Sequence, residues 1–440
     1  MSMKEIGLGK ALAMTCRAGR MTPGERKELA QKRLKELAAY AGQNSPYYGR
    51  LYKGLPEDWK LTDLPTVNKV DLMAHFDMWL TDRTVTEEAV NSFMEDRENI
   101  GRLMDGKYLI FTTSGSTGSP LVVLYDKTCM NISSALSVLR AYARKEDLSA
   151  FIKKGKRTAS IFAEGFYLGS GSVKYQLRRM PWKKGMMMNL DVRTPTAEIV
   201  EKLNRFSPVM LGGYPSGLEL LADEQAAGRL HISPAIVMTG GELLRDEVRE
   251  KLADAFGGYV QTNYSCTEGG TMCHECVNRH LHINDEWIMI EAVDEDNRPV
   301  PDGTQSAKIL LTNLANKVQP FIRYEVSDRI VMHHEECGCG CGEQEGMDGV
   351  VTLVDEDGVE HGFEIIDMVE LDGAQYVAVV PADEEPEEDD ESDELVLLKV
   401  VAEGVEEFLE AIESEEEFNR VSAVFMERLK DDYDFVEGEE

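Results

Sequence analysis

Short apolar runs alternate with helical patterns through the middle of the 440-residue chain. Each apolar run has the length and composition of a buried strand, and the segments between them space their apolar residues as amphipathic helices do. This alternation predicts parallel strands joined by crossover helices, because parallel neighbours require a long connection. The strand-like runs are YLIF, LVVLY, TASIFA, VMLGGY and AIVMTGGE, and the helix-like segments are TPTAEIVEKLNRF, GLELLADEQAAG and RDEVREKLADAFG. We therefore predict an α/β fold with mostly parallel sheets.

The pattern differs toward the two ends of the chain. Near the start, Thr22, Pro23 and Glu25 form the signature of a helix N-terminus with a capping box. Beyond about residue 280, the strand-like segments HLHINDEWIMIEAV, SAKILLTNL and DRIVMHH follow one another without helices, which predicts an appended β subdomain. Further strands and two short helices follow a break near GCGEQEGMDG, as is typical of a small α+β domain. We predict a large N-terminal domain of several subdomains over 1–345, with a helical leader over about 1–105, and a small acidic C-terminal domain over 346–440.

Negative charge is concentrated in the C-terminal part of the chain. Residues 346–440 contain 34 acidic and 4 basic side chains, whereas the first 345 residues contain 46 acidic and 43 basic ones. Nucleic-acid binding through phosphates is excluded as a function class, because no basic surplus exists to displace counterions. We interpret the acidic part as a solvated surface that aids solubility rather than as a partner-binding surface. With no apolar run near about 18 residues and no signal-peptide pattern, we expect a cytoplasmic protein without a membrane partner.

A loop rich in small polar residues separates the first two strand-like runs. The segment FTTSGSTGSP (111–120) has eight Thr, Ser and Gly residues in ten positions and is longer than a hairpin turn needs to be. Small residues allow a backbone to approach an anion closely, so that N–H groups and hydroxyls surround it. The loop is not a Walker A motif, which requires Gly-Lys-Ser/Thr and a following helix. Taken alone, such a loop is more often a flexible linker than a phosphate site.

Four segments resemble, in order, the motifs of the adenylate-forming superfamily, which includes acyl-CoA synthetases, adenylation domains of peptide synthetases and luciferases. TSGSTGSP (113–120) resembles its phosphate loop, TGGE (239–242) its adenine-contacting loop, NYSCTE (263–268) its Tyr-x-x-Thr-Glu motif, and FIRYEVSDR (321–329) the segment whose aspartate holds the ribose. The leader NSPYY…LPTVNKVDL and the segment LHINDEWIMIEAVD are similar to the phenylacetate-CoA ligase-like branch. The resemblance covers about residues 40–345. It implies the superfamily fold and an AMP-forming ligase that activates a carboxylic acid with ATP.

The resemblance also implies a role for each motif residue. The predicted ATP- and AMP-binding residues are Thr113, Ser114, Gly115, Ser116, Thr117, Gly118, Gly241, Glu242, Asn263, Tyr264 and Asp328. Thr267 and Glu268 are the predicted catalytic residues, with Thr267 at the α-phosphate and Glu268 as the Mg²⁺ ligand, since a carboxylate is a hard oxygen donor. Each of these side chains could singly be structural, but their joint spacing favours the site.

Two further segments, AEGFYLGSG (163–171) and LGGYPSG (211–217), lie where this branch lines its acyl pocket. Phe166, Tyr167 and Tyr214 would form an aromatic wall there, suited to an aryl or apolar acid. Core packing of the same three rings is an equally frequent outcome.

Clustered cysteines and histidines indicate a metal site. Cys-x-x-Cys at 273–276, the nearby His280 and His282, and CGCGC at 337–341 offer more soft ligands than the four that Zn²⁺ needs. Many relatives in the resembled branch carry a Cys, a following His and a later Cys-x-Cys-Gly. That pattern implies a structural Zn²⁺ site made of Cys276, His282, Cys337 and Cys339, with Cys273 and Cys341 as alternates. A redox disulfide is the other interpretation.

The C-terminal domain departs from the family pattern. The resemblance implies a hinge of the form Gly-Arg-x-Asp-Asp and, later, a lysine in a Ser-Gly-Lys type segment that serves adenylation. Neither is present, and the lysines after Lys317 are Lys399 and Lys430, which lie in other contexts. Leu121 also stands where most members end the phosphate loop in lysine. The acidic domain should in addition repel ATP and CoA, which are polyanions.

Three functions remain open. The first is a ligase that transfers the activated acyl group to CoA, and the second is the same adenylation with a carrier protein, an amine or a coenzyme as the acceptor. The third is a nucleotide-binding protein without turnover that acts as a scaffold. We expect ATP, Mg²⁺ and a structural Zn²⁺ as cofactors, with CoA left open. The expected partners are a small carboxylic acid and either CoA or a carrier protein, and a homodimer is left open.

Overall fold

The computed structural model describes residues 5–113, 120–140, 142–334, 337–339, 350–354, 360–371, 374–381, 395–403, 406–412 and 414–429. The chain divides into two compact units, each of which is described by itself. The body comprises Met21–Gly342, and the tail unit comprises Met1–Arg20 together with Glu343–Glu440. Within the described ranges, no helix is both long and apolar enough to cross a membrane.

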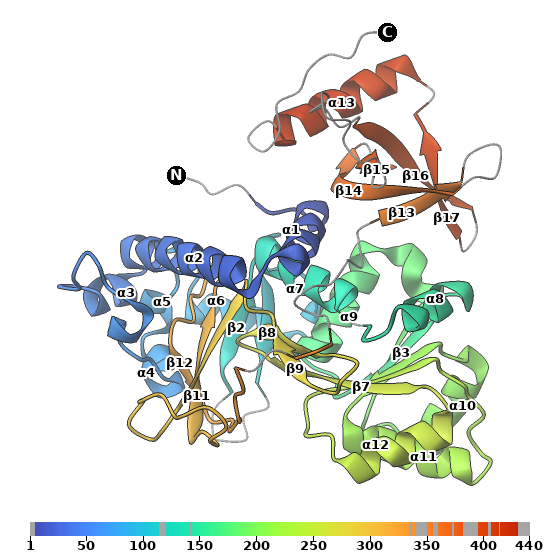
Figure 1. Cartoon of the computed structure of the whole chain (residues 1–440), viewed down its shortest axis with the longest axis horizontal. Helices are drawn as coiled ribbons and strands as arrows, with labels where there is room; N and C mark the ends of the chain where they lie inside the picture. The colour runs from blue at the N-terminus through green and yellow to red at the C-terminus, as the bar shows by residue number, and fades with distance from the viewer. Residues whose placement is uncertain are drawn as a thin grey trace. The chain divides into compact units, whose positions relative to one another are not determined.

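A seven-stranded sheet lies at the centre of the described body (Figure 1). Its order is β4-β3-β5-β6-β7-β8-β9; the first five of these strands pair in parallel, and β8 and β9 are added antiparallel. The strands are β3 (Thr158–Phe162), β4 (Met187–Asp191), β5 (Met210–Gly213), β6 (Ile236–Thr239), β7 (Tyr259–Cys266), β8 (Gly270–Glu275) and β9 (Leu281–Ile283). The predicted α/β fold class with mostly parallel strands is confirmed.

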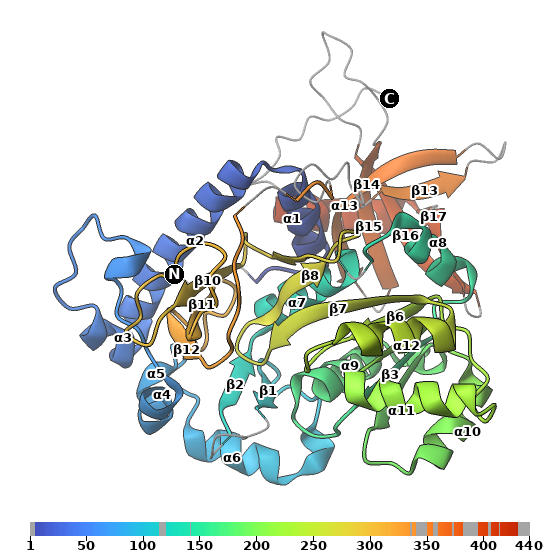
Figure 2. The same ribbon diagram turned by 60° about the horizontal axis from the view of Figure 1, so that its bottom comes forward.

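Three amphipathic helices cover one face of this sheet (Figures 1 and 2). They are α10 (Thr196–Phe206), α11 (Pro215–Ala226) and α12 (Asp246–Phe256). Leu203, Leu221 and Leu252 of these helices belong to one buried cluster with Leu211 and Val237 of the strands. The apolar stripe of each helix is thus removed from water against the sheet, which is the main source of stability for such a layer.

Two smaller antiparallel sheets complete the described body. β1 (Leu109–Thr112) pairs with β2 (Val122–Tyr125), so the strands that flank the Gly/Ser/Thr-rich loop form a pair of their own. β10 (Ile288–Val293), β11 (Lys308–Asn313) and β12 (Tyr324–Val326) form the other sheet. The strand expected at DRIVMHH is wrong in position, because β12 ends at Val326 and Val331 makes only an isolated bridge to Gln305.

The leader of the body is helical. Its first helix, α2 (Pro23–Asn44), begins with the predicted capping box: the Thr22 hydroxyl accepts from the Glu25 N–H at 3.3 Å, and the Glu25 carboxylate accepts from the Thr22 N–H at 2.7 Å. The other described helices of the body are α3 (Pro46–Leu51), α4 (Lys69–Ala74), α5 (Phe76–Trp79), α6 (Glu87–Glu95), α7 (Lys127–Leu139), α8 (Lys145–Lys153) and α9 (Leu168–Arg179), with 3₁₀ turns η1 (Leu61–Asp63), η2 (Arg97–Asn99) and η3 (Pro181–Gly185).

The tail unit is built on an antiparallel sheet in the order β13-β14-β15-β16-β17. Its elements are β13 (Val350–Val354), β14 (Glu360–Leu371), β15 (Ala374–Pro381), β16 (Val396–Glu403), β17 (Glu406–Ala411), α13 (Glu415–Leu429) and the N-terminal helix α1 (Leu8–Arg20). α1 packs against β14, and Val421 and Phe425 of α13 share a buried cluster with Tyr376 and Leu397. The first helix of the chain therefore groups with the C-terminal residues, whereas the sequence assigned it to the leader.

Candidate active site

A large cleft of about 1490 Å³ lies within the body. On one side it is lined by residues that end or follow parallel strands: Phe162 of β3, Tyr214 after β5, Thr239 and Gly240 of the β6 end, and Ser265 to Glu268 at the end of β7. Across from them it is lined by the start of α4 and by the segment from Tyr324 to Arg329. Ligands bind characteristically at the carboxyl ends of parallel strands in open α/β sheets, so the cleft occupies the position expected of a binding site.

Of the predicted nucleotide-binding residues, Thr113, Gly241, Asn263 and Asp328 line the cleft. The Tyr264 hydroxyl donates to Oδ2 of Asp328 at 2.6 Å, although 63 residues separate the two in the sequence. Burial raises the pKa of Tyr264, and the Asp328 carboxylate raises it further, so the phenol keeps its proton. Asp328 and Asn263 line the cleft, while Tyr264 supports Asp328 from beside it.

The Gly240–Gly241 turn after β6 has no room for side chains. A Cβ on Gly241, which has a φ of +79°, would lie 2.8 Å from the Tyr214 ring, and one on Gly240 would lie 2.8 Å from Oδ1 of Asn263. The turn therefore presents bare backbone to the cleft. Glu242 does not line the cleft; its carboxylate accepts from the N–H and the hydroxyl of Ser216 at 3.1 and 3.0 Å, at the start of α11. The role predicted for Glu242 at the nucleotide stays a prediction.

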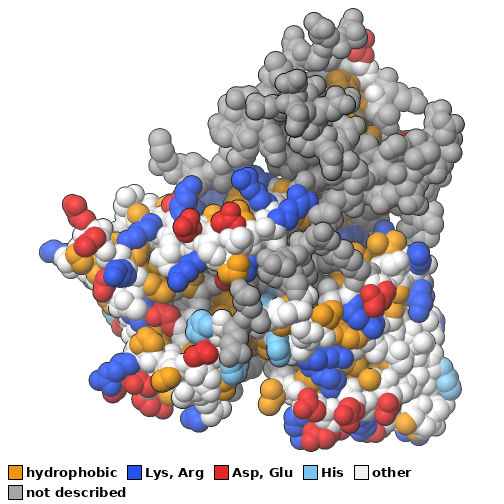
Figure 3. Space-filling model, in the orientation of Figure 1, with side chains coloured by type: hydrophobic (Ala, Val, Ile, Leu, Met, Phe, Trp, Pro, Cys, Tyr) orange, Lys and Arg blue, Asp and Glu red, His pale blue; other side chains and the backbone are white. Residues whose placement is uncertain are grey.

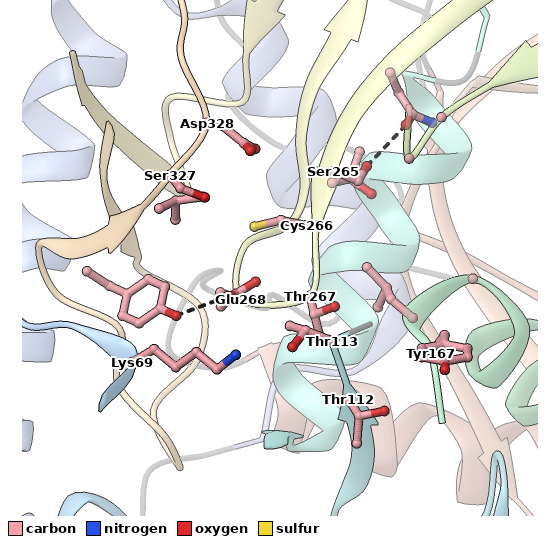
Figure 4. A pocket seen from close by; sticks show the side chains of 18 of the residues that line it. Lys69, Thr112, Thr113, Tyr167, Ser265, Cys266, Thr267, Glu268, Ser327 and Asp328 are labelled. Atoms are coloured by element: carbon pink, nitrogen blue, oxygen red, sulfur yellow. Dashed lines mark hydrogen bonds between the residues drawn. The ribbon is translucent and has the colours of Figure 1, made fainter. Parts of the chain in front are cut away.

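Glu268 is a buried carboxylate at the floor of the cleft. Its side chain is 7% exposed, and Oε1 accepts from the Tyr324 hydroxyl at 3.2 Å (Figure 4). Burial raises the pKa of Glu268, hydrogen bonds from Tyr324 and Cys266 partly oppose this, and the Asp328 charge adds to it. A buried acid that faces a cleft and has few donors is a favourable ligand for a hard cation such as Mg²⁺. Thr267 beside it is held through its carbonyl, which accepts from the Tyr125 hydroxyl at 2.9 Å.

Only the base of the Gly/Ser/Thr-rich loop lies among the described residues. Thr113 and Leu121 close it: the Thr113 N–H donates to the Leu121 carbonyl at 3.0 Å, and the Leu121 N–H donates to the Thr113 hydroxyl at 2.9 Å. The predicted phosphate-binding residues Ser114, Gly115, Ser116, Thr117 and Gly118 lie outside the described residues. Leu121, which occupies the usual lysine position, is fully buried and sends no side chain into the cleft.

The predicted aromatic wall is partly rearranged. Tyr167 and Tyr214 line the cleft, whereas Phe166 does not and Phe162 does instead. Phe162 and Tyr214 pack edge to face with their ring centroids 5.1 Å apart. Sequence reasoning also missed a set of cleft-lining hydroxyl residues: Thr112, Ser133, Ser137, Ser172 and Thr271. The i, i+4 spacing of Ser133 and Ser137 on α7 is the signal that could have found two of them.

The four predicted metal ligands lie together. The ligand atoms of Cys276, His282, Cys337 and Cys339 all lie within 4.8 Å of one another, with the two sulfur atoms of Cys276 and Cys337 at 3.8 Å. Tetrahedral sulfur ligands about 2.3 Å from a zinc ion are about 3.8 Å apart, so the arrangement fits Zn²⁺, whereas a disulfide requires about 2.05 Å. Cys273 is buried on β8 away from the four, with its pKa raised to about 12 by burial, and Cys341 lies outside the described residues.

Known proteins resemble the greater part of the chain. It is 26% identical over 327 residues to a phenylacetate-coenzyme A ligase of Thermus thermophilus, covering 71% of this chain and 67% of the relative. It is 20% identical over 317 residues to protein CapK of Staphylococcus aureus, covering 70% of this chain and 63% of that protein. The structure superposes on an open conformation of 2-hydroxyisobutyryl-CoA ligase, solved with 2-HIB-AMP and CoA, with a TM-score of 0.56 at 19% identity over 82% of this chain and 79% of that one. The body is thus similar in sequence to a phenylacetate-coenzyme A ligase and similar in fold to 2-hydroxyisobutyryl-CoA ligase.

The C-terminal part matches a different group of proteins. A family described as a protein of unknown function (DUF1292) matches residues 356–430. A UPF0473 protein of Caldicellulosiruptor bescii is 40% identical over 94 residues, which is 21% of this chain and 94% of that protein, and one of Caldicellulosiruptor saccharolyticus is 39% identical over 94 residues. Residues 356–430 therefore belong to the DUF1292 family. The hinge and lysine of the ligases are missing because this segment is related to DUF1292 proteins, whereas the body resembles ligases.

Proposed function

We propose that the chain is an AMP-forming ligase that activates a small carboxylic acid with ATP as an acyl-adenylate. The observation that carries the proposal is the meeting of Thr267, Glu268 and Asp328 in one cleft at the carboxyl edge of the parallel sheet. These are the residues for which the superfamily motifs imply contact with the α-phosphate, Mg²⁺ and ribose. Their convergence in a cleft large enough for ATP and an acid supports adenylation over the scaffold alternative.

In the proposed reaction, an oxygen of the substrate carboxylate attacks the α-phosphorus of ATP, and the bond to the bridging β-phosphate oxygen breaks. Pyrophosphate leaves with the electron pair of that bond. Asp328 accepts from the ribose hydroxyls, and Tyr264 holds Asp328 in place. The Gly240–Gly241 turn lets the adenine approach the backbone closely. Glu268 is the residue that would hold Mg²⁺, which supplies charge neutralisation at the phosphates.

For the acid, we propose an aryl or apolar side chain that lies against Tyr167 and Tyr214. These rings and Phe162 form one wall of the cleft, and flat aromatic surfaces suit an aryl group. The relative from Thermus thermophilus is named for phenylacetate and the structural neighbour for 2-hydroxyisobutyrate. The cleft-lining hydroxyl residues would permit a polar substituent on such an acid.

We propose CoA as the acceptor of the activated acyl group, because the relatives are CoA ligases. A carrier protein, an amine or a coenzyme is the alternative acceptor, because residues 356–430 match DUF1292 and not the C-terminal domain that the resemblance implies.

We further propose that Cys276, His282, Cys337 and Cys339 hold a structural Zn²⁺. The donor set and spacing fit a closed four-ligand site, which has no open position for a substrate. The ion would join the β8–β9 hairpin to the segment at 337–339. Its role would be stability of the body and not catalysis.

The test is pyrophosphate release from Mg·ATP across a panel of aryl and aliphatic acids, with and without CoA. Release that depends on one acid is the expected result, and faster turnover with CoA identifies the acceptor. Carrier proteins and amines replace CoA in a second series. Binding of ATP without release for any acid would instead favour the nucleotide-binding scaffold.

A further inference from the structure

Lys69 is a cleft-lining lysine within the leader segment LPTVNKVDL, and the sequence resemblance assigned no role to it. It is the first residue of α4, is half-buried, and lines the cleft together with Asn68, Val70 and Met73. Its amine has neither a hydrogen bond nor an ion pair with another described residue. A lysine in a cleft without a carboxylate partner is suited to bind an anionic ligand.

The fold fixes the position of Lys69 rather than leaving it on a loose loop. Val67, two residues earlier, extends the β12 sheet: its N–H donates to the Arg323 carbonyl at 3.1 Å, and its carbonyl accepts from the Glu325 N–H at 2.9 Å. The buried Arg323 guanidinium also donates to the carbonyls of Thr62 and Leu64 at 3.0 and 2.6 Å. These bonds tie the segment before Lys69 to the strand that carries Tyr324 into the cleft.

The helix that follows is fixed as well. The Asn68 side chain caps α4 by accepting from the Asp71 N–H at 3.0 Å, and Leu72 is fully buried beneath the helix. Lys69 therefore begins a capped and anchored turn. Figure 4 shows its amine turned toward Glu268 and Thr113, with Asp328 on the other side of Glu268.

Negative charge predominates around the cleft, so a cation there is important for binding ATP. Four carboxylates line it, those of Glu268, Glu295, Glu325 and Asp328, and the triphosphate of ATP adds further negative charge. Of the described cations that line it, Lys308 is paired with Glu325 at 3.1 Å, and Arg329 directly follows the ribose-side Asp328. Lys69 is the lining cation that faces the region between Glu268 and the base of the phosphate loop.

We propose that Lys69 binds the β- and γ-phosphates of ATP and neutralises the pyrophosphate as it leaves. The inference rests on the proposed adenylation function. It assigns to the cleft a positive charge that the buried Leu121 does not provide. Lys69 acts as a fixed charge and transfers no proton, so the atoms and electrons of the step balance as written above.

The experiment compares nucleotide binding to the full chain and to its variants. The ligands are AMP and α,β-methylene-ATP with Mg²⁺, measured by isothermal titration calorimetry without any acid. Lys69→Ala should weaken the ATP analogue about 10- to 100-fold, as expected for a lost charged hydrogen bond, and should change AMP less than about threefold. Lys69→Arg should recover most of the analogue affinity. Lys202→Ala, which removes an exposed lysine of α10, is the matched control and should match the wild type.

The outcomes separate this inference from the proposed function. If the wild type binds both nucleotides and Lys69→Ala weakens both equally or neither, the assignment of Lys69 to the β- and γ-phosphates is overturned while the nucleotide site stands. If the wild type binds neither nucleotide, both proposals fall. The melting temperature of each nucleotide-free variant confirms that the cleft is folded, and Lys69→Met, which retains the aliphatic chain, repeats the measurement should the alanine variant unfold.

Discussion

The body and the tail unit place their charged groups in opposite ways. In the body, acidic and basic side chains are nearly balanced, and Figure 3 shows them interspersed on the visible surface. Two of its charged groups that have no ion pair among the described residues line one cleft: Glu268, which is buried, and Lys69. The tail unit has a large acidic excess, and Lys399 of its sheet forms an ion pair with Glu417 inside the unit.

The groups of the proposed reaction that the structure describes therefore all lie in the body. A carboxylate that is buried without a paired cation lowers the stability of the fold. Such a group is typical of a site where a ligand or a metal ion binds to it. An ion pair on a sheet and its covering helix, such as that of Lys399, carries no such implication. We infer that the body contains every group needed for adenylation, and the following variants test that inference.

The largest effect is expected for Glu268→Gln. The amide keeps the size of the side chain and can still accept from Tyr324, but it is a poor Mg²⁺ ligand. Acid-dependent pyrophosphate release should fall about 10²- to 10³-fold, the usual range for a lost electrostatic group at a reacting phosphate or carbonyl. The measurement is a coupled pyrophosphate assay at several Mg²⁺ concentrations.

The same variant has an expected signature without substrate. Burial raises the pKa of Glu268, so the folded state loses stability as the pH rises from the ordinary pKa of a glutamate to the raised value, and this cost is constant at higher pH. Glu268→Gln removes the cost, so the nucleotide-free variant should melt higher than the wild type at neutral pH and differ less from it in acid. A variant that melts lower at neutral pH while retaining activity would contradict both the burial argument and the catalytic role.

Asp328→Ala should have the next largest effect. Loss of an acceptor for the ribose hydroxyls should weaken AMP and ATP alike by about 10- to 100-fold. Tyr264→Phe, which removes the donor at 2.6 Å but leaves Asp328 in place, should weaken both by only a few fold. Calorimetric titration of both nucleotides measures this. A larger loss in Tyr264→Phe than in Asp328→Ala would mean that the tyrosine and not the aspartate holds the nucleoside.

The sequence predicted those parts of the body that depend on local pattern. The alternation of strands and helices, and the capping box at Thr22 and Glu25, follow from short-range spacing and are confirmed. The exchange of Phe166 for Phe162 in the cleft wall was not foreseen, because it depends on where β3 ends and the following turn begins. The packing of α1 against β14 joins distant parts of the chain and leaves no local pattern to detect.

In the candidate site, too, some residues were predicted from the sequence and others were not. Cys276, His282, Cys337 and Cys339 were singled out because their spacing matches a resembled pattern, and the structure brings their ligand atoms together. Lys69 was quoted only as part of the leader segment LPTVNKVDL, and Ser133 and Ser137 offered only their i, i+4 spacing, so no role at the cleft was assigned to any of them. The role of a residue can be predicted from sequence where a motif implies that role. It cannot be predicted where only a neighbouring strand positions the residue.

Zinc removal should affect stability rather than turnover, and a matched pair of cysteines tests this. Cys276→Ala should abolish stoichiometric zinc, measured by elemental analysis, and lower the melting temperature by about 5–10 °C, since metal binding is folding free energy in such sites. Cys273→Ala removes a buried cysteine of β8 that is not among the four ligands and should retain the zinc. Equal zinc loss in both variants would place Cys273 among the ligands. A loss of activity at temperatures where Cys276→Ala is still folded would give the metal a catalytic part.

The smallest effect on pyrophosphate release is expected for Lys399→Met. This variant tests whether the tail unit contributes to the reaction that we assign to the body. Lys399 donates to Oε1 of Glu417 at 2.8 Å, and this pairing lowers the pKa of Glu417. The pair's contribution to stability is present above the ordinary pKa of a glutamate and is lost as the pH falls through the lowered value. Removing the lysine should therefore slightly destabilise the tail unit at neutral pH, with the difference from the wild type vanishing in acid.

If the body is self-sufficient, pyrophosphate release should change less than about twofold, as for other exposed ion pairs away from a site. A loss approaching that of Glu268→Gln would mean that Lys399 leaves Glu417 to serve the reaction, and the tail unit would then share the chemistry that we assign to the body alone.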